Sequence, residues 1–542
     1  MSKVAHYLQE HLTGEVIASA GVRKHFSTDG SIFKILPSLV VYPKNENDVR
    51  KTARFCWQLA ERGRTMPITA RSAGTNQSGG AIGSGIIMNF AAHMNRILEY
   101  DGKSGVVVAE PGLNYGRLEQ TLHTHGRFLP PYPSSVEFSS IGGAVAENSG
   151  GEKSLKYGQT LKYVKNLRVV LANGEAIEVK KLNKRELSRK LGLSTLEGQI
   201  YRELDKLIEE NHETVAKSRL SVSKNTAGYN LADIKQKGSF DLTPLLVGAQ
   251  GTLGVITEVT LGTEPYNPAT TLLVALVDDS KVAQECISEV LKFSEPPSSI
   301  ELIDKSVLEL ADKHNPNLLA GVINKPFASL VLIMEFDDTN AKVQKRLAAK
   351  AKKVLERYEL NPMVESDPTA KDHIKKIHRA ISAAMSHAEG KVPLPVIDDG
   401  IVPVEHLAEF LEASRQLLSS QRVTSVLWGQ GGDANLHIQP FLDLSEIGDV
   451  QRVFKLLQDY CKLVADFGGS TSGENNDGRL RAPYLKDLYG EEVYGLFAQV
   501  KQIFDPYGIM NPGVKINVTL DDIKPLLRTE YSNPLLYQHL TS

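Results

Sequence analysis

Two glycine-rich turns in the carboxyl-terminal half carry side chains that could act on a substrate. The first, WGQGGDANLH, covers residues 428–437 and joins two apolar stretches, so we predict a hairpin that brings Gln430 and His437 together. The second, GGSTSGENNDGR, covers residues 468–479 and contains Glu474. Imidazole and carboxylate are good ligands for zinc or manganese, but an amide in place of a second histidine binds such ions far more weakly. The pattern leaves open a metal-dependent site or a site that has lost its metal.

Glycine-rich stretches in the amino-terminal half could enclose a phosphate-bearing ligand. RSAGTNQSGGAIGSG covers residues 71–85, PPYPSSVEFSSIGGAVAENSGGEKSLKYG covers 130–158, and GAQGTLGVITEVTL covers 248–261. Glycine allows backbone N–H groups to crowd around an anion, and the hydroxyl and amide side chains supply further donors. None of the stretches matches the GxGxxG or GxxxxGK[ST] pattern, and any one of them alone could be a surface loop. Together they favour a long, extended ligand.

The composition is that of an ordinary globular protein with more than one domain. The chain has 542 residues, 41% hydrophobic and 23% charged, with a formal net charge of -2, so neither nucleic acid nor an anionic membrane is a favoured partner. Cys56, Cys286 and Cys461 are far apart and form no CxxC pair, which argues against disulfides, zinc ribbons and iron–sulfur clusters. Because the chain contains no apolar signal core and no apolar run of membrane-spanning length, we expect a cytoplasmic protein without a transmembrane segment.

A change in the length and spacing of the predicted strands and helices along the chain predicts the domain organisation. Short β-rich runs with one helix over residues 46–63 precede a charged, helical surface insertion at 181–220. After about residue 263, longer strands alternate with helices over 280–293 and 340–358, which suggests an antiparallel sheet with helices on one face. We therefore predict an α+β protein with a first domain at 1–263, a second at 264–513 and a tail at 514–542.

The three glycine-rich stretches, in this order, resemble the flavin-binding domain of the vanillyl-alcohol oxidase/PCMH superfamily. The carboxyl-terminal half is similar to the cap domain of the FAD-linked D-lactate, glycolate and D-2-hydroxyglutarate dehydrogenases, and the match ends in FDPYGIMNPGVKI. The resemblance implies a PCMH-type FAD-binding domain of two subdomains and a cap whose antiparallel sheet is covered by helices. It also implies non-covalent FAD, because Thr75 stands where relatives with a covalently bonded flavin have a histidine.

The resemblance assigns cofactor contacts to particular residues. It places the FAD diphosphate at residues 71–78, and the rest of the cofactor along the other two stretches. The implied cofactor-binding residues are Arg71, Ser72, Ala73, Gly74, Thr75, Asn76, Ser78, Pro131, Ser134, Ser135, Gly142, Gly143, Asn148, Gly151, Gly251, Gly254, Ile256 and Asn511. Tyr229, in KNTAGYNL, either faces the reactive edge of the flavin or is a buried structural tyrosine.

The cap departs from the family at the positions expected to do chemistry. The family pattern G-H-x-G-D-G-N-L-H supplies two metal-binding histidines, of which the first is Gln430 here and the second is His437. The pattern S-x-E-H-G supplies a carboxylate ligand and then a catalytic base, which correspond to Glu474 and Asn475. The implied metal ligands are thus Gln430, His437 and Glu474, which we expect to hold zinc or manganese weakly or not at all. For His437, a hydrogen-bonded histidine within a sheet is the alternative.

Of two further substrate-binding positions in the cap, one has the family's residue and the other does not. Arg379 matches an arginine that would bind a substrate carboxylate, with an exposed helix arginine as the alternative, whereas Ile397 replaces an expected lysine. The implied catalytic residues are Arg379, Asn435, His437, Glu474 and Asn475. Asparagine cannot accept a proton near neutral pH, which leaves His378, His387, Tyr229 or a bound water to act as base.

The resemblance implies an FAD-dependent oxidoreductase with an altered substrate or mechanism. Its partners would be a small hydroxy carboxylate, a separate electron acceptor through which the protein could also meet a membrane at its surface, and a second copy of the chain in a homodimer. The alternative is an FAD-binding subunit without dehydrogenase activity that serves electron transfer or protein interaction.

Overall fold

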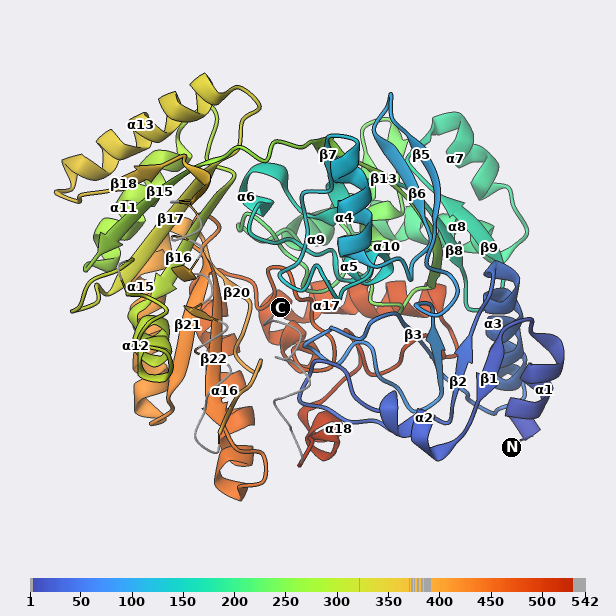
Figure 1. Ribbon diagram of the computed structural model, residues 1–542. Coiled ribbons are helices and arrows are strands. Elements are labelled where there is room, and N and C mark those ends of the chain that lie inside the picture. The colour runs from blue at the N-terminus through green and yellow to red at the C-terminus, as the bar shows by residue number, and fades with distance from the viewer. Residues whose placement is uncertain are drawn as a thin grey trace.

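Three sheets contain most of the strands of the protein (Figure 1). The computed structural model describes residues 3–529 except 321, 370, 372–373, 375, 378–379, 382–383 and 385–390. A four-stranded and a five-stranded sheet come mainly from the amino-terminal half, and an eight-stranded sheet comes from the carboxyl-terminal half. Figure 1 shows the eight-stranded sheet on the left and the two smaller sheets on the right. The predicted α+β class is confirmed.

The four-stranded sheet presents the first glycine-rich loop. Its strands, in spatial order, are β1 (Glu15–Ile17), β2 (Leu39–Tyr42), β4 (Ile86–Asn89) and β3 (Ile68–Arg71). The last three are parallel, and β4 is buried along its whole length, as its apolar sequence requires for an inner strand. Helix α3 (Glu46–Glu61) fulfils the predicted helix and starts at Asn45, whose side chain accepts a hydrogen bond from the Asp48 N–H. The chain leaves β3 at Arg71 and enters the loop of residues 72–85.

The five-stranded sheet carries the other two glycine-rich stretches. It is antiparallel, with the strand order β5 (Ile97–Asp101), β6 (Val106–Ala109), β13 (Val255–Gly262), β8 (Val164–Val170) and β9 (Ala176–Val179). The second stretch contains α5 (Ile141–Glu147), which ends at Asn148 in the left-handed conformation with a φ of 55°. The third stretch runs into β13, and Ile141, Ala144 and Val145 of α5 pack in the apolar core of the same sheet.

The charged insertion is helical, as predicted, but it is more than a surface feature. It forms α7 (Lys184–Leu191), α8 (Leu196–Glu210) and α9 (His212–Lys217). Helix α7 buries no residue, whereas α8 buries Ile200, Leu204 and Ile208 in the core beneath the five-stranded sheet. These three residues are spaced four apart and share one helix face, so the charges of α8 lie on the other faces.

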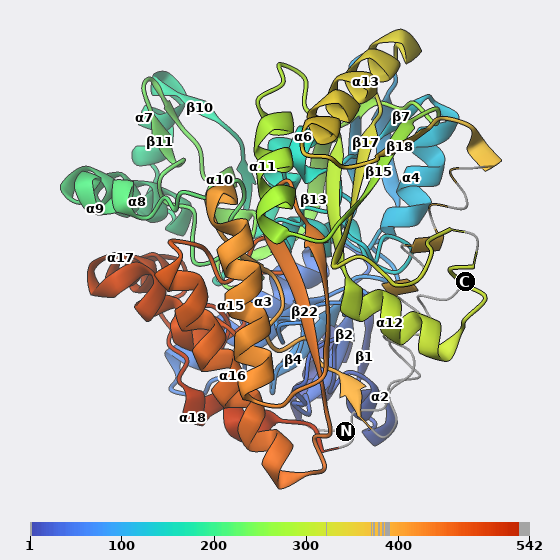
Figure 2. The same cartoon turned by 90° about the vertical axis from the view of Figure 1, so that its left-hand side faces the viewer.

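The eight-stranded sheet forms the cap and is antiparallel throughout. Its strands, in spatial order, are β18 (Met363–Glu365), β15 (Thr271–Val277), β17 (Leu330–Phe336), β16 (Ser299–Asp304), β21 (Ser425–Gln430), β22 (Asn435–Leu442) and β19 (Val392–Pro393), with β20 (Gly400–Ile401) also paired to β22. The apolar side chains that cover one face come from α11 (Ser280–Leu291), α13 (Ala341–Arg357), α15 (Leu407–Ser420) and α16 (Ile447–Asp466). Figure 2 shows α15 and α16 running beside β22.

Helices cover both faces of this sheet, and not one face as predicted. Helix α12 (Lys305–His314) packs against the second face. The reason is visible in β15, where Leu273 and Ala275 enter the core on the α11 side while Leu272 and Val274 enter the core on the α12 side. A strand that is apolar at both alternating positions has two faces to bury.

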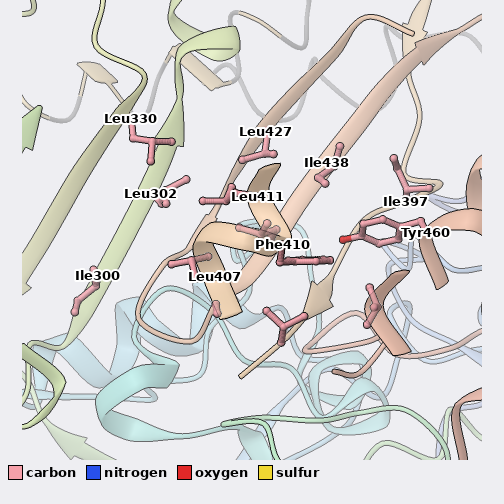
Figure 3. Close-up of a cluster of buried hydrophobic side chains, with 14 of the residues drawn as sticks. Ile300, Leu302, Leu330, Ile397, Leu407, Phe410, Leu411, Leu427, Ile438 and Tyr460 are labelled. Atoms are coloured by element: carbon pink, nitrogen blue, oxygen red, sulfur yellow. The ribbon is translucent and has the colours of Figure 1, made fainter. Parts of the chain in front are cut away.

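An apolar cluster binds α15 to the cap sheet (Figure 3). Leu407, Phe410 and Leu411 of the helix lie in one buried cluster with Leu302, Leu427 and Ile438 of the strands. Ile397, which stands where the family has a lysine, is 1% exposed and belongs to the same cluster. Its side chain therefore contributes to packing, and it offers a substrate no charge.

The segment from α17 (Leu485–Phe504) to Met510 returns to the amino-terminal half. Helix α17 runs beside α8 and α9 (Figure 2) and buries Leu496, Phe497 and Val500 in the core of the five-stranded sheet. Met510 forms a parallel bridge with Ile68 at the start of β3. The divisions at residues 263 and 513 stay predictions. Among the residues that the structure describes, no helix has both the length and the apolar character needed to cross a membrane.

We expect Phe410→Ala to lower the free energy of unfolding by about 3–5 kcal/mol, because it removes a large ring from a filled core. Phe410 is 0% exposed, whereas Ile447 at the start of α16 is 77% exposed, so Ile447→Ala is the control and should change stability by less than about 0.5 kcal/mol. Urea titrations followed by circular dichroism measure both. Equal stability of the two variants would contradict this account of the cap core.

Candidate functional site

The hairpin of the cap places two of the candidate residues on one face of the sheet. Strands β21 and β22 are joined by the turn of residues 431–434, with Gln430 opposite Asn435 and Trp428 opposite His437. Directly paired residues share a face, and so do residues two apart on one strand. Gln430 and His437 are therefore diagonal neighbours, and both side chains face Glu474 of the second turn.

The carboxylate of Glu474 is the point at which the candidate residues meet. Its Oε1 accepts a hydrogen bond from Gln430 Nε2 at 3.3 Å and lies 3.4 Å from His437 Nε2. Its Oε2 accepts from the backbone N–H of Gly151 at 2.8 Å and from Lys224 Nζ at 3.1 Å. Gly151 and Lys224 belong to the amino-terminal half, so this one carboxylate joins the cap to the second glycine-rich stretch.

Lys224 is a buried cation in this site. Its side chain is 3% exposed, and its Nζ lies 3.3 Å from Gln430 Oε1, 3.2 Å from Ser154 Oγ and 3.7 Å from Asp433 Oδ2. Burial works to lower the pKa of Lys224, but the carboxylates of Glu474, Asp433 and Asp399 outweigh it and raise that pKa. The three carboxylates therefore stabilise the ammonium form of Lys224. KNTAGYNL contained this residue, but sequence reasoning singled out only Tyr229 there.

His437 lies between two carboxylates. Its Nδ1 is 2.7 Å from Asp398 Oδ1, and its Nε2 faces Glu474. Burial would lower the pKa of His437, yet Asp398 and Glu474 together raise it to about 10. The same contacts, with Lys224, hold the pKa of Glu474 far below its usual value against the effect of burial. The raised pKa favours the imidazolium form of His437, in which both ring N–H groups can donate to the two carboxylates.

The donor set does not fit a divalent metal. Gln430 Oε1 accepts from the Lys224 ammonium, and both ring nitrogens of His437 face carboxylate oxygens. In the described ranges, no three His, Cys, Asp or Glu residues are grouped to hold a metal ion. The side chains that the family uses as ligands form a network of ion pairs and hydrogen bonds here.

Asp399 holds the second turn in place. Its carboxylate accepts from the Glu474 N–H at 3.0 Å, the Asn475 N–H at 2.7 Å and the Ser472 hydroxyl at 2.8 Å. Asn435, which is fully buried, donates to the same carboxylate at 3.2 Å. Two of the expected catalytic residues, Asn435 and Asn475, therefore shape the turn that carries Glu474. Asp398 and Asp399 were not singled out from the sequence.

The structure describes Tyr229 of KNTAGYNL but not the remaining candidate residues of the cap. Arg379 lies outside the described residues, as do His378 and His387. Tyr229 is 3% exposed, donates or accepts a hydrogen bond with Thr252 Oγ1 at 2.7 Å, and packs edge-on against Phe497. Tyr229 also lines the larger cavity, so both alternatives for this residue stay predictions.

The glycine-rich stretches surround a cavity of about 90 Å³ in the amino-terminal half. Of the residues implied to bind the cofactor, those that line it are Arg71, Ser72, Ala73, Gly74, Thr75, Asn76, Gly142, Gly143, Gly251, Gly254 and Ile256. Those outside its lining are Ser78, Pro131, Ser134, Ser135, Asn148, Gly151 and Asn511. Several of the second group hold loops: Asn511, for example, donates to the carbonyls of Gly80 and Gln250.

Two buried donors of this cavity suit an anionic ligand. Arg71 donates from Nη1 to the Thr28 carbonyl at 2.7 Å, but its Nε has no partner among the described residues. Gln250, which the sequence analysis did not single out, also lines the cavity and has an unpartnered Nε2. Buried donors are normally satisfied, so these two atoms fit a ligand rich in acceptor oxygens, as a diphosphate is.

A larger cavity of about 420 Å³ shares a wall with the first. Glu147 and Leu246 line the smaller cavity, while their chain neighbours Asn148 and Val247 line the larger one. Asn476 joins the two segments of this wall by donating to the Glu147 and Gly248 carbonyls. Lys224 also belongs to the segment that lines the larger cavity, whereas Gln430, His437 and Glu474 are not among the lining residues.

Glu147 puts an ionisable group into the wall of the smaller cavity. Its carboxylate accepts from Asn76 Nδ2 at 2.8 Å. Burial raises the pKa of Glu147 to about 7; Asp29 and Asp399 also raise it, whereas the Asn76 hydrogen bond and Arg481 act in the opposite direction. Glu147 is therefore mainly neutral below pH 7 and mainly negative above it.

Family models match both halves of the chain. The model described as FAD binding domain matches residues 37–180, and the model described as FAD linked oxidases, C-terminal domain matches residues 267–514. The D-2-hydroxyglutarate dehydrogenase of Escherichia coli (strain K12) is 29% identical over 520 residues, which cover 93% of this chain and 50% of that protein. The Glycolate oxidase subunit GlcD of Bacillus subtilis (strain 168) is 26% identical, with 89% of each chain covered. The chain spans about half the length of the D-2-hydroxyglutarate dehydrogenases that it matches.

A solved structure has the same fold at low sequence identity. The p-cresol methylhydroxylase structure with substrate bound superposes with a TM-score of 0.69 at 12% identity, covering 96% of this chain and 97% of that one. The expected PCMH-type architecture is thereby confirmed.

We expect Arg71→Glu to weaken FAD binding by about 10- to 100-fold, because it places a negative charge in the cavity whose free donors suit the diphosphate. Lys184→Glu makes the same charge change on the exposed helix α7 and should leave binding intact. The flavin content of the two purified variants measures the contrast. If both retain equal flavin, the cavity does not hold the phosphates.

A pH dependence of FAD binding follows from Glu147. Since raising the pH through 7 converts its carboxyl group to a carboxylate beside an anionic ligand, FAD should bind about 3- to 10-fold more weakly at pH 8 than at pH 6. Glu147→Gln keeps an acceptor for Asn76 and should remove this dependence. Fluorescence titration of the flavin-free protein measures both, with Glu137→Gln, an exposed position, as control. An unchanged pH profile in Glu147→Gln would exclude this role.

Proposed function

We propose that this chain, which belongs to the FAD-linked oxidases of the vanillyl-alcohol oxidase/PCMH superfamily, is an FAD-dependent oxidoreductase that oxidises a 2-hydroxy acid. The observation that carries the proposal is the hydrogen bond from the Gly151 N–H to Glu474 Oε2 at 2.8 Å. It ties the turn that contains the expected catalytic residues to the glycine-rich stretch expected to border the flavin. The cap chemistry and the cofactor-binding domain thus meet at one point.

The chain's own residues provide binding and charge. The loop of residues 71–76 and Gln250 would hold the diphosphate of a non-covalently bound FAD. Bound FAD would supply the acceptor for the hydride that leaves the α-carbon of the substrate. Lys224 and His437 place buried N–H donors at the edge of the cap, paired there with Glu474 and Asp398, and an anionic hydroxy carboxylate could take over part of this pairing. The D-2-hydroxyglutarate, D-lactate and glycolate enzymes among the relatives are consistent with this substrate class.

The proton of the substrate hydroxyl needs an acceptor other than the family's histidine. Asn475 has no basic atom near neutral pH, and the lowered pKa of Glu474 makes that carboxylate a weak base. The altered base is a reason to expect a substrate or a mechanism different from that of the relatives. Re-oxidation would use a separate electron acceptor, because Cys56, Cys286 and Cys461 are buried, unpaired and far apart in sequence.

Two measurements on the purified protein test the proposal. After acid denaturation and filtration, the yellow flavin should pass through the filter, since it is not covalently bound. Under anaerobic conditions, at least one of D-lactate, glycolate and D-2-hydroxyglutarate should bleach the flavin, and the corresponding 2-oxo acids should not. Retention of the colour on the protein would refute non-covalent binding. A flavin that none of these acids reduces would favour the FAD-binding subunit without dehydrogenase activity.

A further inference from the structure

The position of Lys224 suggests what has replaced the metal. Its Nζ lies 3.3 Å from Gln430 Oε1 and 3.1 Å from Glu474 Oε2, which are atoms of two side chains at the metal-ligand positions implied by the resemblance. His437, at the third position, faces the other oxygen of the same carboxylate. The cation between these side chains is therefore a lysine ammonium supplied by the amino-terminal half.

We propose that Lys224 is the resident cation of this site and that its ammonium excludes a divalent metal. A metal bound by Gln430 Oε1 and Glu474 Oε2 would stand about 2 Å from each oxygen, which is space that the ammonium borders directly. Two cations so close together repel each other strongly in a buried site. The exclusion is thus a property of Lys224, and the replacement of a histidine by Gln430 is only part of the change.

The surroundings of Lys224 prevent it from moving aside. Its side chain is 3% exposed, and Ser154 and Asp433 add a hydroxyl at 3.2 Å and a carboxylate at 3.7 Å. An ammonium has three N–H donors, and leaving this cluster would cost hydrogen bonds to several buried acceptors at once. Outward movement would also leave Glu474 and Asp433 without their shared cation.

The ammonium also has a task in catalysis, and this part of the inference rests on the proposed function. When a 2-hydroxy acid is oxidised, the hydroxyl proton goes to a base and the α-hydrogen leaves as a hydride to the flavin, so negative charge develops on the substrate oxygen. Lys224 belongs to the segment that borders the larger cavity, and a substrate oxygen that entered this site would take the N–H that Lys224 now directs at Gln430 Oε1. It keeps its own proton throughout, and it supplies the positive charge that a metal would otherwise provide.

Zinc binding tests the exclusion without reference to activity. We compare the FAD-loaded wild type, Gln430→His, Lys224→Met and the double variant Gln430→His/Lys224→Met, measuring bound zinc after dialysis and the rise in Tm on adding zinc. Only the double variant should retain about one zinc per chain, because it alone has the histidine and lacks the ammonium. Gln430→His/Lys184→Met is the control for the loss of one lysine elsewhere, and it should bind no more zinc than Gln430→His.

Two outcomes would overturn the inference. One is Gln430→His binding zinc as tightly as the double variant, since the ammonium would then exclude nothing. The other is a double variant with normal flavin content and an unchanged circular dichroism spectrum that binds no zinc. If Lys224→Met does not fold, Lys224→Gln replaces it in the same comparison, because glutamine keeps hydrogen bonds to the neighbouring acceptors but carries no charge.

Flavin reduction tests the catalytic task. Lys224→Met should slow reduction by the active hydroxy acid about 100- to 1,000-fold at unchanged flavin content, and Lys224→Arg should recover part of the rate. Treatment of the wild type with EDTA should leave its rate unchanged. A rate that EDTA abolishes and zinc restores would show that a metal, and not Lys224, does this work. If no hydroxy acid reduces the wild-type flavin, the proposed function fails while the zinc comparison still decides the role of Lys224.

Discussion

A buried carboxylate between the two halves of the chain is the constraint on which the site depends. Taking an ion such as Glu474 out of water costs several kcal/mol unless opposite charges and hydrogen bonds replace its hydration. Its four neighbours come from separate segments: Gly151 and Lys224 from the amino-terminal half, Gln430 and His437 from the cap hairpin. The halves must therefore meet in one arrangement for this charge to be satisfied. The same requirement places the cap side chains beside the glycine-rich loop.

The rest of the cap can be understood as the scaffold that delivers this carboxylate. Asp399 collects the N–H groups of the second turn, and Asn435 at the start of β22 holds Asp399, so the turn is attached to the sheet edge. The apolar cluster around Phe410 packs that sheet against its helices, and Ile397 belongs to this cluster. Polar residues of the turn and apolar residues of the cluster thus act on the same strand, β22, from its two sides. Precision at the site comes from this combination of a packed sheet and a turn whose N–H groups are bonded to Asp399.

Charge also explains why the site differs from one built around a metal. A metal site needs neutral or anionic donors that converge on an empty space, whereas here two cationic side chains, Lys224 and His437, share the carboxylates. The positive charge beside Glu474 is therefore supplied by side chains of the protein itself. This charge does not depend on the supply of metal ions, and it cannot be removed by a chelator. In the cofactor half, the backbone and the unpartnered donors Arg71 Nε and Gln250 Nε2 leave room for a ligand that brings its own negative charge.

The sequence alone determined the fold class, a helix beginning at residue 46, the cap hairpin and the glycine-rich lining of the smaller cavity. Each of these is encoded by local periodicity or by glycine and turn residues close together in the chain. It also identified the altered positions Gln430, Asn475 and Ile397, since these can be read against a motif. Only the tertiary structure decided what these changes mean. Lys224 lies about two hundred residues before Gln430, and Asp398 and Asp399 lie outside both turns, so no spacing in the sequence could indicate that they meet Glu474 and His437. Long-range contacts of this kind are set by how the halves bury their charges together, and that is a property of the folded chain.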